Sequence, residues 1–173
     1  MRLLPSILLL STGLALVASD AAQAQQNRRA ERLVGGNENP PVISEGTGRF
    51  RPRIAEDQIK FELSYDGLLD VQQAHLHIAN PGNNGGIVVF LCSNLGNAPA
   101  GATVRECPPA GEVEGDIIAT DVQTVVEDTT TIIEAGDLPG LIRLIRQGSV
   151  YANVHTLAHP AGEIRGQLFP RIR

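Results

Sequence analysis

Short stretches of alternating apolar and polar residues recur along this sequence, and they limit the possible folds more than any other feature. Residues 59–65, 74–78, 150–154 and 164–168 each place apolar side chains at every second position. This period is typical of strands with one buried face, because successive side chains of a strand point to opposite faces. Turns rich in Gly, Pro and Asn separate the stretches. The sequence therefore predicts an all-β fold, an antiparallel sandwich of short strands.

One segment departs from this pattern and predicts a short helix near residues 138–147. Asp137 can cap a helix N-terminus, Pro139 suits a first turn, and Gly148 suits a C-terminal end. Apolar residues between positions 141 and 145 are spaced as on one face of a helix.

The N-terminus has the features of an export signal. Arg2 precedes an apolar run over residues 3–17, and Ala22-Gln23-Ala24 has the small-x-small pattern that a signal peptidase accepts. The run is shorter than the roughly 20 residues of a membrane span, and no second run follows. We therefore expect a periplasmic or secreted protein whose mature chain has no membrane span. The expected division is a signal peptide over residues 1–24, cleaved after Ala24, a flexible tail over 25–31 and one domain over 32–173.

The two cysteines, Cys92 and Cys107, are expected to form a disulfide. Export places them in an oxidising compartment, where an even pair of cysteines usually becomes a bridge. The alternative is that a thiolate acts as a metal ligand or a nucleophile.

The charge balance argues against a nucleic-acid partner. The chain has 14 Lys and Arg against 19 Asp and Glu, which gives a net charge of −5. A nucleic-acid binder needs a concentrated basic surface, and stacking on bases needs aromatic side chains. Here aromatic residues make up 3% of the chain and Trp is absent. We expect no nucleic-acid partner and no organic cofactor.

Four histidines and one glutamate form the candidate metal site. His75 and His77 lie two positions apart in a predicted strand, so they point to the same side. The same parity places His155 and Glu163 on the polar sides of their own strands, and His159 lies in the turn between these two strands. If these strands are neighbours, the side chains can converge on an ion such as Cu²⁺ or Zn²⁺, which imidazole nitrogens bind well.

An alternative interpretation needs no metal. The polar side of a strand is often simply solvated, and a turn histidine such as His159 is often merely exposed. In this interpretation Glu163 and Arg165 form a structural ion pair that holds the final strand, and such a pair contributes on the order of 0 to 1 kcal/mol.

Three segments resemble the CHRD domain family, which is named for the repeated domain of chordin. They are residues 33–42 (LVGGNENPPV), residues 74–77 (AHLH), and the pair 151–156 and 160–168 (YANVHT and PAGEIRGQL). The resemblance covers about residues 32–169. It implies an immunoglobulin-like β-sandwich in a single-domain exported bacterial member, and it implies a relation to extracellular proteins that bind other proteins.

These observations lead to three hypotheses for function. The first is an exported module that binds Cu²⁺ or Zn²⁺ through its histidines. The second is a periplasmic or extracellular protein-interaction domain without a metal. The third, a copper-dependent redox enzyme, is the least favoured, because the sequence has no recognisable catalytic motif. The sequence leaves the oligomeric state open.

Overall fold

The computed structural model describes residues 30–168. The predicted signal peptide lies outside the described residues, as do positions 25–29 of the predicted tail and the last five residues. The elements in chain order are β1 (Glu31–Val34), η1 (Gly35–Asn37), β2 (Thr47–Ile54), β3 (Ile59–Asp66), β4 (Val71–Ile78), β5 (Ile87–Ser93), β6 (Gly111–Ile117), η2 (Ala119–Asp121), β7 (Val125–Glu127), β8 (Thr130–Ile133), α2 (Leu138–Gln147), β9 (Val150–Thr156) and β10 (Ile164–Gln167).

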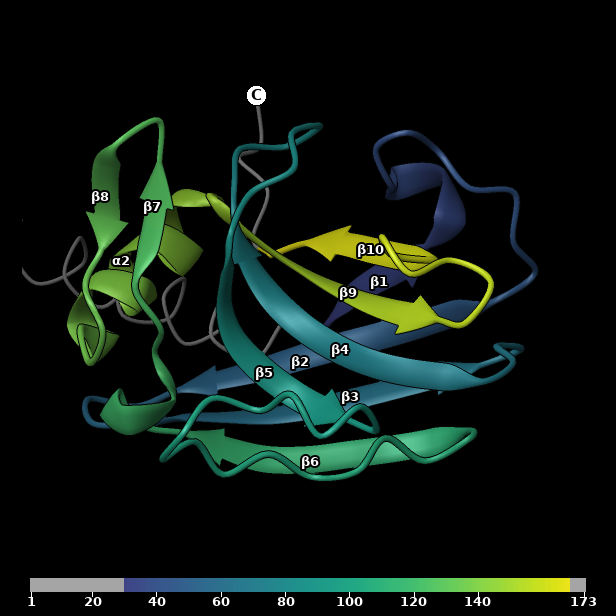
Figure 1. Ribbon diagram of the computed structural model, residues 1–173, viewed down its shortest axis with the longest axis horizontal. Coiled ribbons are helices and arrows are strands. Elements are labelled where there is room, and N and C mark those ends of the chain that lie inside the picture. Colours follow the sequence, from purple (N-terminus) through teal and green to yellow (C-terminus); the bar gives the residue numbers. More distant parts are fainter. Residues whose placement is uncertain (1–29, 169–173) are drawn as a thin grey trace, which may run out of the picture.

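Eight of the strands form one continuous antiparallel sheet. Its order is β5-β4-β9-β10-β1-β2-β3-β6, and β7 and β8 form a separate hairpin. In Figure 1 the strands β2, β3 and β6 run almost horizontally, and β4, β5 and β9 cross them. The all-β, antiparallel prediction is confirmed. The immunoglobulin-like sandwich is not, because these strands curl as one nearly closed, barrel-like sheet and do not divide into two.

A crosslink joins β5 to the segment that precedes β6. Cys92 at the end of β5 forms a disulfide with Cys107, with their Cα atoms 5.1 Å apart. The backbone N–H of Ser93 donates to the carbonyl of Arg105 over 2.8 Å, next to an isolated bridge between Cys92 and Arg105. The predicted disulfide is therefore confirmed, and it holds the segment before β6 against β5.

The interior of the sheet is apolar and matches the period-two pattern of the sequence. Leu33, Phe50, Leu63, Leu76 and Ile164 come from five different strands, and all are fully buried. Because burial of apolar surface is the main driving force of folding, this shared core fixes which face of each strand points inward.

The predicted helix is confirmed as α2 and packs its apolar face on the core. Asp137 accepts a hydrogen bond from the backbone N–H of Gly140, and Gly148 ends the helix in the left-handed conformation, with φ +75°. Leu141 and Ile145 are fully buried. Within residues 30–168 no helix is long and apolar enough to span a membrane.

Strand β1 includes the last residue of the segment that the sequence analysis assigned to the tail. Glu31, expected in the tail, is part of β1, where it is buried and pairs with Phe50 of β2. Glu31 therefore lies within the sheet.

The polar faces of β4, β9 and β10 are covered by three loops, residues 38–46, 79–86 and 157–163. Asn84 Nδ2 donates to the carbonyl of Asn39 over 2.8 Å, and Ser44 Oγ donates to Glu163 Oε1 over 2.6 Å. These bonds tie the covering loops to one another. This polar sheet face, which the alternative interpretation of the sequence takes as solvated, is therefore buried. It holds the candidate site.

Candidate metal centre

The structure brings three of the five candidate ligands together. His75 and His77 on β4 and His155 on β9 offer nitrogen atoms that all lie within 4.8 Å of one another. The pairing of β4 with β9 causes this, because His75 lies opposite Asn153 and His155 lies opposite Gln73. His75, His77 and His155 are buried residues, with exposed fractions of 0%, 7% and 5%. We call these three residues the histidine cluster.

Backbone carbonyls fix the orientation of two rings in the cluster. His77 Nδ1 lies 2.9 Å from the carbonyl oxygen of Gly85, and His155 Nδ1 lies 3.0 Å from that of Pro160. A carbonyl can only accept, so each Nδ1 carries the proton and each Nε2 keeps its lone pair. Histidines that bind metals usually donate their second nitrogen in this way.

The third ring is oriented by the second. His75 Nδ1 lies 3.0 Å from His155 Nε2. Because the lone pair of that Nε2 accepts, His75 Nδ1 donates, and His75 Nε2 is left with a lone pair. All three Nε2 atoms therefore carry lone pairs, which is the form that coordinates a cation.

Two of these lone pairs have no hydrogen-bond partner. His75 Nε2 and His77 Nε2 are buried nitrogen atoms without a donor among the described residues. Leaving such a group unsatisfied costs about 1–3 kcal/mol. A bound ion would satisfy both atoms, so the donor set fits a metal that prefers imidazole.

The electrostatic setting keeps the rings neutral. Desolvation by burial lowers the pKa of His75 to about 2 and the pKa of His77 to about 4. Burial also lowers the pKa of His155. Metals bind neutral imidazole, so these rings need not lose a proton before an ion binds at neutral pH.

A stacked set of side chains supports His77. Its ring lies parallel to that of Tyr151, with centroids 4.8 Å apart and an interplanar angle of 3°. The guanidinium carbon of Arg165 lies 3.4 Å from the centroid of the Tyr151 ring. Arg165 also donates to the carbonyl of Asn83 over 2.7 Å and to Asn84 Oδ1 over 3.2 Å. Arg165 thereby holds this loop in place, and Gly85, which follows Asn84, orients His77.

Gly85 is suited to this position because it has no side chain. A Cβ atom there would collide with the carbonyl oxygen of Ile78. The close approach lets the loop present its carbonyl to His77.

The other two candidate ligands lie outside the cluster. Glu163 accepts hydrogen bonds of 2.6 Å from Ser44 Oγ and from Thr156 Oγ1, and His159 belongs to the turn after β9. The expected ion pair between Glu163 and Arg165 is not formed in residues 30–168, because both side chains have other partners.

Two residues near the cluster have roles that the sequence does not predict. Strand parity places Tyr151 on the same face as His155, but its stacking on His77 depends on the pairing of β4 with β9. Glu38 lies in an irregular segment without periodicity, and its proximity follows only from the folded chain. Burial raises the pKa of Glu38 to about 7.

Comparison with known proteins identifies a family for this chain. The family model of the CHRD domain matches residues 30–168, the same range that the structure describes. No curated protein and no solved structure matches the chain.

Proposed function

The chain belongs to the CHRD domain family, and we propose that it is an exported domain that binds one Cu²⁺ or Zn²⁺ ion through His75, His77 and His155. The observation that carries this proposal is the pair of buried nitrogen atoms, His75 Nε2 and His77 Nε2, that lack a hydrogen-bond partner beside a third imidazole. The resemblance to known family motifs adds support for the positions of these histidines.

The available ligands favour these two ions. Both cysteines are in the disulfide, and the one methionine of the chain is Met1. Soft ions such as Cu⁺ prefer sulfur, whereas imidazole suits Cu²⁺ and Zn²⁺. When bound, such an ion supplies a positive centre with a position left for water or another ligand.

The protein residues would have distinct parts in binding. His77 and His155 would bind through Nε2 while Gly85 and Pro160 keep the opposite nitrogen protonated. Binding at His155 Nε2 replaces the hydrogen bond that it now accepts from His75. His75 must therefore adjust, and the other two rings are already oriented.

Export is the second part of the proposal. The disulfide is typical of an oxidising compartment. The N-terminal sequence pattern adds support for secretion or a periplasmic location.

Titration calorimetry of the metal-free protein with Zn²⁺ and Cu²⁺ tests the metal proposal. We expect one ion per chain, and at least about tenfold weaker binding in His77→Ala, since a ligand is lost. His159→Ala is the matched control, because it removes a histidine outside the cluster. Absence of stoichiometric binding, or equal effects of both substitutions, would contradict the proposal.

A protein-interaction role is the second candidate function. Ile43, Leu69 and Leu157 are large apolar side chains with exposed fractions of 102%, 82% and 68%. Leu157 donates its N–H to the carbonyl of Asp70, so the turns carrying Leu69 and Leu157 are adjacent. If this end of the sheet binds a protein, Leu69→Ser/Leu157→Ser should release a partner that wild type retains from an envelope extract. If the variant retains the partner as well as wild type does, the result would count against this role.

A further inference from the structure

The outer face of β1, β2, β3 and β6 separates positive from negative side chains. Each of three cross-strand rows has a cation on β2 and an acid on β6, with a residue of β3 between them. The rows pair Arg49 with Glu112, Arg51 with Glu114, and Arg53 with Asp116. We call this surface the charged face.

The register places like charges directly opposite each other on this face. Arg32 of β1 lies opposite Arg49, and Glu62 of β3 lies opposite Glu114 of β6. Like charges at such positions destabilise a sheet. At these two pairs the repulsion must be offset by other contacts, within the chain or with a partner.

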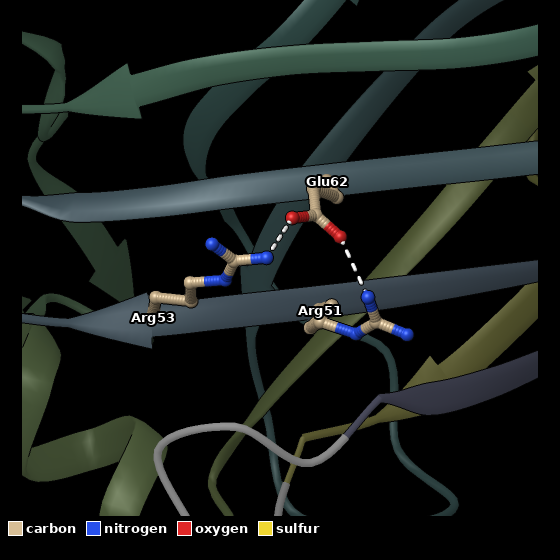
Figure 2. A network of polar contacts seen from close by, with 3 residues as sticks. All are labelled: Arg51, Arg53 and Glu62. Carbon is tan, nitrogen blue, oxygen red and sulfur yellow. Dashed lines mark hydrogen bonds and ion pairs between the residues drawn. The ribbon is translucent and has the colours of Figure 1, made fainter.

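Ion pairs within the chain neutralise only part of the face. Arg51 and Arg53 both pair with Glu62, the former over 2.8 Å (Figure 2). Lys60 pairs with Asp116 over 3.4 Å. Within residues 30–168 no ion pair involves Arg49 or Glu112, and both are exposed.

We propose that the charged face binds the same face of a second copy of this chain. A two-fold axis parallel to β3 would exchange the positions of β2 and β6 and leave each row at its own level. Arg49 would then face Glu112 of the second copy, and Arg51 and Arg53 would face its Glu114 and Asp116. On the axis, Glu62 and Lys60 would meet their own copies and would keep the ion pairs that they form within the chain. Self-complementary contacts of this kind are typical of two-fold dimers.

The dimensions and charges of the face fit a dimer better than a polyanion. β2 and β6 lie on either side of β3, and strands are about 4.8 Å apart, so the two charged stripes are about 10 Å apart. A sulfated polysaccharide drawn to β2 would lie against the acids of β6. At about 0.1 M salt the Debye length is about 10 Å, which weakens long-range repulsion between chains of equal charge but spares contact pairs.

Sedimentation velocity of the purified chain, from about 10 μM to about 1 mM, tests the proposal. We expect a reversible dimer in wild type, with a dissociation constant at least about tenfold higher in Arg49→Glu and in Glu112→Lys, because each creates like-charge contacts. An equimolar mixture of these two variants should restore dimerisation to within about threefold of wild type. In the mixed dimer both contacts again join opposite charges.

Two exposed positions away from the face provide matched controls. Arg146→Glu and Glu134→Lys change the net charge by the same amounts and should leave association unchanged. The proposal would be overturned if wild type stays monomeric over the whole concentration range. It would also be overturned if the mixture of the two variants does not dimerise, or if the controls weaken association as much as Arg49→Glu and Glu112→Lys do. A monomer that binds heparin as a sulfated probe and loses that binding in Arg49→Glu would likewise overturn it.

Discussion

The three buried histidines make the stability of the fold depend on pH. In the folded chain burial lowers the pKa of His77 from 6.5 to about 4, and it lowers the pKa values of His75 and His155 as well. The unfolded chain takes up protons near pH 6.5 while the folded chain does not. The contribution of the neutral rings to the free energy of unfolding is therefore fully present above pH 6.5. It is lost as pH falls from 6.5 towards 4.

Urea unfolding between about pH 7 and about pH 5 measures this effect. We expect the free energy of unfolding to fall with decreasing pH, by at most about 1.4 kcal/mol per pH unit for each histidine. His77→Gln should reduce the slope. A free energy that is constant or rises towards pH 5 would contradict the burial of neutral rings.

Glu38 acts in the opposite direction. Burial raises its pKa from 4.5 to about 7, so the folded chain holds a proton that the unfolded chain has released. Its contribution is fully present below pH 4.5 and is lost as pH rises towards 7. We expect Glu38→Gln to remove this loss, and hence to steepen the decline in stability on acidification in the same urea experiments. An unchanged pH profile would show that Glu38 is not held protonated.

Arg165 links the covering loops to the histidine cluster. It is 2% exposed and both stacks on Tyr151 and donates to Asn83 and Asn84. A lysine ammonium cannot reproduce the planar stack and the forked donors together. We expect Arg165→Lys to destabilise the fold by about 2 kcal/mol and to speed amide hydrogen exchange in residues 79–86.

The exposed Arg143 provides the control for that experiment. Arg143→Lys should leave both quantities unchanged. If amide hydrogen exchange in residues 79–86 is as slow in Arg165→Lys as in wild type, other contacts hold the loop.

Among the elements, those with a strong local pattern are the ones that the sequence predicts well. Helix α2 carries its own cap, apolar stripe and terminating glycine, so its bounds match. Leu76 alternates with His75 and His77, and this parity places Leu76 in the core and the histidines on the opposite face. No local sequence pattern indicates that the opposite face becomes buried, because the loops over residues 38–46 and 79–86 cover it only in the folded chain.

The sheet as an element shows the same limit. Alternation determines which side of a strand is apolar, but one curled sheet and two packed sheets require the same alternation. The position of β10 between β9 and β1 depends on contacts between the two ends of the domain. The roles of Glu163 and Arg165 were missed for this reason, since their partners, such as Ser44 and Asn83, are distant in sequence.

The disulfide links β5 to the segment before β6, and its removal tests the contact between them. Cys92 and Cys107 are 15 positions apart, for which loop-closure entropy gives about 3 kcal/mol. We expect Cys92→Ala/Cys107→Ala to lower the free energy of unfolding by about that amount in urea. Reduced wild type should behave like the variant. A loss below about 1 kcal/mol would mean that other contacts hold the segment before β6 against β5 without the bridge.

At the scale of the whole molecule, the histidine cluster exists only when the sheet is assembled. His75 and His155 are 80 positions apart in the chain, and the pairing of β4 with β9 brings them together. An unfolded chain cannot offer the same three nitrogen atoms to one ion. Metal binding should therefore stabilise the folded state by mass action.

Thermal unfolding with and without Zn²⁺ measures this coupling. At an ion concentration of about 100 times the dissociation constant we expect about 2.7 kcal/mol of added stability, which raises Tm by on the order of 10 °C. Removal of the ion with EDTA should reverse the shift. His159→Ala should keep the shift, and His77→Ala should lose most of it, because only His77 belongs to the cluster. Equal shifts in both variants would mean that Zn²⁺ binds elsewhere on the surface, and a lowered Tm would mean that it binds the unfolded chain more tightly than the assembled sheet.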